Sequence, residues 1–121
     1  MKNRTKNNMK YQFNRETRKI ICERDGRCIF CSRGYHMENR DAMLYGIADI
    51  MHYRNKSAGG LGIPENGALG CRYHHNLLDN GSKGLREEML GIFRDHLQQK
   101  YPGWDERKLV YNKWDFLTSG Q

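Results

Sequence analysis

The sequence contains no long apolar run, and this absence excludes a membrane-spanning helix. Such a helix needs roughly 20 predominantly apolar residues, and no stretch of the chain approaches that length. The basic start, MKNRTKNNMK, is not followed by an apolar segment, so we expect no signal peptide. These absences predict a cytoplasmic protein with no membrane partner.

Cysteine is also scarce, with four residues among 121. In the reducing interior of a cell, cysteines are more naturally metal ligands than disulfide partners. A chain of this length makes one domain with a modest hydrophobic core. A metal ion that joins distant segments would therefore matter for folding.

Acidic residues are rare in the first 33 positions, which contain three of them and ten lysines and arginines. The rest of the chain carries eleven residues of each sign, so the whole net charge of +7 lies at the N-terminal end. This distribution is typical of a phosphate-binding surface, although a basic run alone more often serves only solubility. We predict a flexible basic arm over residues 1–13 and then a helix, with Asn14 as its N-cap and Gly26 at its end.

Two short motifs indicate a metal-binding site. Cys28 and Cys31 form a Cys-x-x-Cys, and Cys71 and His74 form a Cys-x-x-His. Three thiolates and one imidazole are the number and type of ligands that tetrahedral structural zinc takes. A redox Cys-x-x-Cys would need a βαβ context that the sequence does not show. We therefore predict a structural Zn²⁺ site, with Cys22 outside it as a buried apolar residue.

The segment between these motifs predicts a β-hairpin, and a helix is expected to follow it. A first strand is expected over residues 46–53, a glycine-rich loop over 54–64 and a return strand from residue 66 to residue 70. The helix is expected over about residues 72–80.

The last third of the chain predicts a longer helix and an aromatic tail. Residues 83–99, with Ser82 as N-cap, carry an apolar stripe at helical spacing. His96 lies on or beside that stripe and is expected to pack rather than to bind a ligand. The large apolar residues of the tail are also expected to pack on the domain rather than stack on bases. They are Trp104, Leu109, Tyr111, Trp114 and Phe116.

Four polar residues near the hairpin remain once zinc has its ligands: His52, Asn66, His75 and Asp79. With Gly59-Gly60 between the first two, their spacing resembles that of HNH endonucleases of the ββα-metal class. The zinc-bracketed form found in many phage and mobile-element nucleases fits best. Several independent spacings agree, so the resemblance depends on more than a single pattern.

The resemblance implies metal-dependent hydrolysis of DNA phosphodiester bonds, which needs a base to activate water and a cation to neutralise charge on the phosphate. It implies that His52 is the general base, a role that suits imidazole because it titrates near neutral pH. Asn66 would hold the hairpin loop and orient the base, and His75 would bind the catalytic ion. The colicin-like branch of the family implies a further ligand at Asp79, which shares a helix face with His75. Mg²⁺ is the expected ion, with Mn²⁺ and Ni²⁺ as alternatives.

One position departs from the family pattern. The family commonly has Asp or His just before the base, as another ligand, and here that residue is Met51, whose thioether binds Mg²⁺ poorly. Asp49, on the same face of a regular strand, is one substitute; otherwise His75, Asp79, water and substrate phosphate hold the ion. A shift of one residue would also exchange the roles of His74 and His75, although the Asn-to-His spacing favours His75 for catalysis.

We expect an α+β fold in which a small zinc-stapled ββα-metal (HNH) core is flanked by N-terminal and C-terminal helices. The core would cover about residues 28–81 of a single domain, 14–121, with the C-terminal helix and tail over 82–121. Contacts with DNA phosphates are expected from five basic residues near the core. They are Arg15, Arg18, Lys19, Arg54 and Lys56.

The sequence is also compatible with two other functions. A non-catalytic zinc module that binds DNA is favoured by Met51. An interaction subunit of a larger phage assembly would use the aromatic tail as its contact surface. HNH domains serve several biological systems, so the motif does not identify the target site, the strand preference, the oligomeric state or the pathway.

Overall fold

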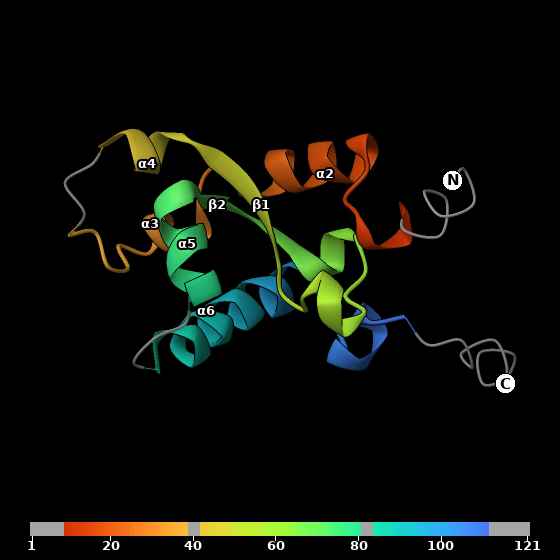
Figure 1. The fold of residues 1–121 in the computed structure, drawn as a ribbon. Helices are drawn as coiled ribbons and strands as arrows, with labels where there is room; N and C mark the ends of the chain where they lie inside the picture. The colour runs from red at the N-terminus through yellow and green to blue at the C-terminus, as the bar shows by residue number, and fades with distance from the viewer. Residues whose placement is uncertain (1–8, 39–41, 81–83, 112–121) are drawn as a thin grey trace, which may run out of the picture.

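The structure, a computed structural model, describes residues 9–38, 42–80 and 84–111 (Figure 1). Within these ranges it is a mixed α+β protein with a small antiparallel sheet, which confirms the α+β part of the expected fold class; the HNH core stays a prediction. No helix in these ranges is both long and apolar enough to cross a membrane. Several predicted features lie outside the described residues: positions 1–8 of the arm, the Ser82 cap, Trp114 and Phe116.

The sheet is a hairpin of strands β1 (Ala48–His52) and β2 (Gly67–Cys71), and helix α5 (Arg72–Asn80) follows it directly. The predicted order of two strands and a helix is therefore confirmed, with a shorter first strand than expected. Met51 is fully buried, and a Cβ atom at Gly70 on the paired strand would lie 2.4 Å from the Met51 sulfur. Met51 is thus a core residue whose side chain leans along β2 from its partner Ala68 to Gly70, where the lack of a Cβ leaves room for it.

Helix α2 (Arg15–Asp25) begins and ends where the sequence predicts. The Asn14 side chain accepts a hydrogen bond from the Thr17 amide at 2.8 Å, which satisfies one of the free N–H groups of the first turn. Gly26 ends the helix with a φ of 74°, a left-handed conformation that suits glycine. The capping residues therefore set both boundaries.

The prediction that Cys22 is buried is wrong, because the side chain is exposed. The buried side chains of α2 are Thr17 and Ile21, which are four residues apart and share one helix face. Cys22 is rotated by about 100° from Ile21 around the helix axis. It therefore faces away from the core.

Three further helices cover the hairpin. They are α3 (Ile29–Ser32), α4 (Ala42–Gly46) and α6 (Leu85–Lys100). Figure 1 shows the hairpin running between α2 on one side and α6 on the other. The side chains that α6 buries recur every four residues, as the predicted apolar stripe requires: Met89, Phe93 and Leu97.

The segment after α6 packs on the loop of the hairpin. The Leu61 amide donates to the Leu109 carbonyl at 2.7 Å, and the Trp104 indole N–H donates to the Glu65 carbonyl at 2.8 Å. Packing of these two tail residues is thus confirmed, whereas Tyr111 is 49% exposed. Four short 3-10 turns complete the described chain: η1 (Met9–Tyr11), η2 (Lys56–Ala58), η3 (Pro64–Asn66) and η5 (Glu106–Leu109).

Residues 9–13, at the end of the predicted arm, are packed against the same loop. The Gly62 amide donates to the Lys10 carbonyl at 2.9 Å. A Cβ atom at Gly62 would lie 2.1 Å from the Gln12 carbonyl oxygen, so only glycine allows this close approach. The N-terminal segment is therefore held beside the end of β1.

Candidate functional site

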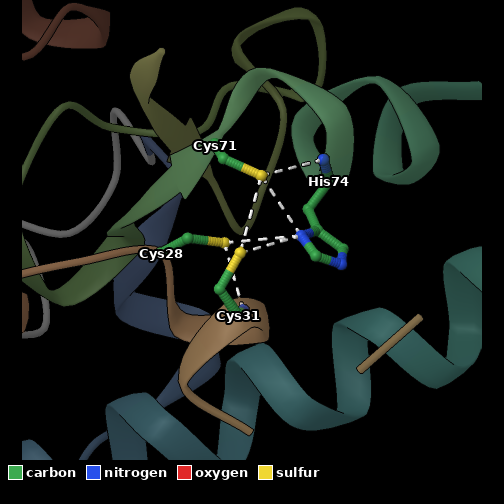
Figure 2. Close-up of side chains that lie close together, drawn as sticks. All are labelled: Cys28, Cys31, Cys71 and His74. Carbon is green, nitrogen blue, oxygen red and sulfur yellow. Dashed lines mark hydrogen bonds between the residues drawn. The ribbon is translucent and has the colours of Figure 1, made fainter. Parts of the chain in front are cut away.

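The first candidate site is a cluster of three cysteines and one histidine (Figure 2). Cys28 and Cys31 lie at the start of α3, Cys71 ends β2, and His74 lies in the first turn of α5. Their side chains point toward one another, with all four ligand atoms within 4.8 Å. The cluster matches the predicted ligand set and could hold a structural metal ion such as zinc.

Backbone groups orient these ligands. The amide of Cys31 lies 3.4 Å from the Cys28 sulfur, and the amide of His74 lies 3.4 Å from the Cys71 sulfur. The His74 Nε2 atom lies 2.5 Å from the Tyr35 carbonyl oxygen. A carbonyl only accepts hydrogen bonds, so Nε2 carries the hydrogen and the lone pair is on Nδ1. Nδ1 is the atom that lies 3.2 Å from the Cys71 sulfur.

The electrostatics of the cluster favour a bound cation. Burial alone raises the pKa of the Cys28 thiol, but its contact with His74 Nδ1 and hydrogen bonds from backbone amides lower it to about 7. Burial and the charge of Cys28 raise the pKa of Cys31 to about 12, and burial also raises that of Cys71. The three thiols thus resist ionising together. A dication would remove that penalty, since zinc binds thiolates and releases their protons.

The second candidate site is a cleft of about 440 Å³ beside the hairpin. His52 reaches it from the end of β1, and His75 and Asp79 reach it from α5. Arg18 and Lys56 also line it. The structure therefore brings the predicted base and two predicted ligands together in one cavity.

His52 is half-buried and held by the N-terminal segment. Its Nε2 atom lies 2.8 Å from the Tyr11 carbonyl oxygen, and its ring centroid lies 4.2 Å from that of Phe13. Because the carbonyl accepts, Nε2 carries the hydrogen and Nδ1 keeps the lone pair. Burial lowers the pKa of His52 and the charges of Lys56 and His75 lower it further, although the Tyr11 carbonyl opposes them. The shift favours neutral imidazole.

His75 lies between two carboxylates. Its Nδ1 atom lies 3.0 Å from Asp49 Oδ2, and its Nε2 atom lies 3.4 Å from Asp79 Oδ2. The two carboxylates thus approach opposite nitrogens of the ring. Asp49 also pairs with Arg72 at 2.7 Å.

Asn66 is fully buried and braces the hairpin loop. Its Oδ1 atom accepts from the Arg54 amide at 2.8 Å, and its Nδ2 group donates to the carbonyls of Arg54 at 3.2 Å and Leu61 at 2.8 Å. The Asn66 carbonyl also accepts from the Tyr53 amide at 2.8 Å. These bonds hold the loop that follows His52.

Comparisons with protein-family models, with curated proteins and with solved structures gave no match to this chain. The resemblance to HNH endonucleases stays a prediction.

The five basic residues predicted to contact DNA fall into three groups. Arg18 and Lys56 line the cleft, while Arg15 and Lys19 are exposed on α2, the helix that carries Arg18. Arg54 is engaged elsewhere, since its guanidinium lies 2.5 Å from the Glu106 carboxylate. Arg54 would therefore have to leave this ion pair to bind a phosphate.

Three partners of the site residues were not anticipated from the sequence. They are the Tyr11 carbonyl and the Phe13 ring beside His52, and the Arg72 guanidinium beside Asp49. Tyr11 and Phe13 belong to residues 1–13, for which the sequence predicts a flexible arm. The contact of Arg72 with Asp49 could have been predicted. The expected helix begins at Arg72, and an arginine at that position can reach the neighbouring strand.

Proposed function

We propose that this protein is a metal-dependent endonuclease of the HNH type that hydrolyses DNA phosphodiester bonds. The observation that carries the proposal is the shared cleft, which His52 lines from β1 while His75 and Asp79 line it from α5. Hydrolysis needs a base and a cation site on either side of a phosphate. These three side chains supply both kinds of group.

His52 acts as the general base in this proposal. The Tyr11 carbonyl occupies its Nε2 atom, so Nδ1 is the nitrogen that takes the proton from water. The lowered pKa of His52 keeps the imidazole neutral near physiological pH, as a base must be. Asn66 contributes by holding the loop behind this residue.

His75 and Asp79 are the proposed ligands of the catalytic ion. One imidazole and one carboxylate fit a divalent cation; imidazole suits Ni²⁺, whereas carboxylate and water suit Mg²⁺ and Mn²⁺. A bound ion there would neutralise charge on the phosphate. Met51 is in the core and contributes no ligand, so we expect weak binding of the ion in the absence of DNA.

The Cys28, Cys31, Cys71 and His74 cluster is proposed to bind structural Zn²⁺. His74 and His75 are neighbours on α5 and project about 100° apart. Fixing His74 against the three sulfurs therefore sets the rotation of the helix and turns His75 toward the cleft. In this way the zinc site orients the catalytic residues.

DNA is the proposed substrate because the cleft has a positive rim. Arg18 and Lys56 lie in it, and Arg15 and Lys19 extend the charge along α2. Phosphate contacts of this kind dominate affinity and weaken steeply with salt. We therefore expect binding of DNA to be sequence-tolerant and salt-sensitive.

The test is nicking of supercoiled plasmid with Mg²⁺, Mn²⁺ or Ni²⁺, with a chelator as blank. We expect His52→Asn to lower the rate by about 10²- to 10⁴-fold, as for loss of a general base. The matched control is His36→Asn, because His36 pairs with the exposed Glu38 and has a φ of 44° that asparagine tolerates.

Other outcomes would contradict the proposal. DNA binding without cleavage under any of the metals would support a non-catalytic zinc module, which the buried Met51 favours. Absence of both binding and cleavage would point to an interaction subunit of a larger assembly. Equal nicking by His52→Asn and the wild type would remove His52 from the mechanism.

A further inference from the structure

A guanidinium and a carboxylate lie beside His75. Arg72 donates through Nε to Asp49 Oδ2 at 2.7 Å and through Nη2 to Asp49 Oδ1 at 3.0 Å. A guanidinium that donates to both oxygens of one carboxylate forms a strong and geometrically specific ion pair. The same Oδ2 atom lies 3.0 Å from His75 Nδ1. The three side chains thus link strand β1 to the first turn of α5.

The arrangement determines which nitrogen of His75 carries the hydrogen. The two hydrogen bonds from the Arg72 guanidinium hold the Asp49 side chain as a carboxylate. An ionised carboxylate has no hydrogen to donate, so Nδ1 of His75 donates in this contact. In neutral imidazole the lone pair is then on Nε2. That atom is the one that lies 3.4 Å from Asp79 Oδ2.

We propose that Asp49 and Arg72 are positioning residues that hold His75 with its Nε2 lone pair available to the cleft cation. The inference rests on the proposed function, because it takes His75 as a ligand of that cation. Asp49 then supports the ligand from the opposite side of the ring instead of binding the ion itself. A carboxylate on the second nitrogen of a ligating histidine fixes the ring and raises its basicity.

Two observations separate this role from a structural one and from direct binding of the ion by Asp49. The side chains of Arg72 and Asp49 are 45% and 18% exposed, and ion pairs with such exposure contribute little to stability. Among the described residues, Asp49, His75 and Asp79 also do not form a cluster of converging ligand atoms, unlike the cysteine site. The effect of the pair is therefore expected at His75 and not in the fold.

The first test is direct. The protein is labelled with ¹⁵N-histidine and loaded with stoichiometric zinc, and the tautomer of His75 is determined by NMR at alkaline pH, where the imidazoles are neutral. We expect His75 to carry its hydrogen on Nδ1 in the wild type and in Asp79→Ala. In Asp49→Ala it should shift to a mixture of both tautomers. Hydrogen on Nε2 in the wild type, or no shift in Asp49→Ala, would overturn the proposal.

The second test measures Mn²⁺ affinity of the same zinc-loaded proteins by calorimetry. We expect Asp49→Ala and Arg72→Gln to weaken binding by about 10- to 100-fold, the range for loss of a partner behind a ligand. Arg54→Gln is the matched control, since it removes an exposed arginine from another ion pair. Unchanged affinity in both Asp49→Ala and Arg72→Gln would count against the positioning role. Circular dichroism and zinc content would verify that each variant is folded.

The two proposals fail in different ways. If plasmid nicking is absent while His75 shows the expected tautomer and Mn²⁺ dependence, the nuclease proposal fails and the positioning inference holds. If His52→Asn abolishes nicking while His75 carries its hydrogen on Nε2, the positioning inference fails and the nuclease proposal holds.

Discussion

The imidazole of His96 donates to the carboxylate of Asp25, with 2.7 Å between Nε2 and Oδ1. The Asp25 side chain is fully buried, and it also accepts from Arg24 Nε at 2.6 Å and from the Leu69 amide at 2.8 Å. One carboxylate therefore joins the end of α2, strand β2 and helix α6. A buried charge is tolerated only when it is paired and hydrogen-bonded in this way.

We expect Asp25→Asn to destabilise the protein in a pH-dependent manner. Burial raises the pKa of Asp25, but His96, Arg24 and the Leu69 amide together lower it from 3.8 to about 2. A lowered folded pKa stabilises the protein above the unfolded pKa, and this stability is lost as pH falls through the folded value. The variant should lose about 2 kcal/mol near neutral pH. Its difference from the wild type should shrink between pH 4 and pH 2, as measured by urea unfolding.

Asp95→Asn is the matched control, because Asp95 is an exposed aspartate of the same helix as His96. It should change the free energy of unfolding by no more than about 0.5 kcal/mol. An equal loss in both variants, or a loss in Asp25→Asn that does not change with pH, would contradict the assignment.

We expect Cys71→Ser to lose stoichiometric zinc and to unfold at a lower temperature. The Cys71 sulfur lies 3.2 Å from His74 Nδ1 and 3.8 Å from the Cys31 sulfur, so its removal opens the ligand set. Wild-type zinc affinity should fall with decreasing pH, because protons compete for the thiolates. Cys22→Ser is the control, since Cys22 is exposed; its zinc content should be unchanged. Zinc retention in Cys71→Ser would contradict the cluster as the site.

Local signals were sufficient to predict much of the fold. Helix α2 is bounded by Asn14 and Gly26 as expected, and α5 covers the predicted residues 72–80. The cluster of three cysteines and one histidine was also predictable. Each ligand pair is closely spaced in the sequence, so the fold has only to bring two pairs together. Capping and ligand spacing act over a few residues, so they can be recognised in the sequence.

Contacts between distant segments could not be predicted in the same way. The bond between His96 and Asp25 joins residues 71 positions apart, and the contact of His52 with Tyr11 spans 41. The sequence predicts only that His96 packs in the core. Its position on the apolar stripe of α6 does not indicate that a buried aspartate of another helix, Asp25, lies beside it. Cys22 was misassigned for a related reason, since residue type alone does not determine which helix face meets the core.

We expect Asn66→Asp to destabilise the protein by about 2–4 kcal/mol, since it leaves buried carbonyl groups without a donor. The Nδ2 group that donates to the Arg54 and Leu61 carbonyls would become an oxygen. The matched control is Asn76→Asp on the exposed face of α5, which should change stability by no more than about 0.5 kcal/mol. Thermal and urea unfolding measure both. A stable Asn66→Asp variant would show that the loop does not depend on this amide.

The pH profile of cleavage should report the environment of His52. Burial lowers its pKa below 6.5, and Lys56 and His75 lower it further, so the neutral base should persist to lower pH than for an exposed histidine. Activity should therefore fall only on the acid side of pH 6.5 as the imidazole gains its proton. Lys56→Gln removes a positive charge and should move this acid limb of kcat/KM to higher pH. Lys19→Gln, on exposed α2, should weaken DNA binding without moving the limb. An acid limb that stays in place in Lys56→Gln would mean that a group other than His52 controls the reaction.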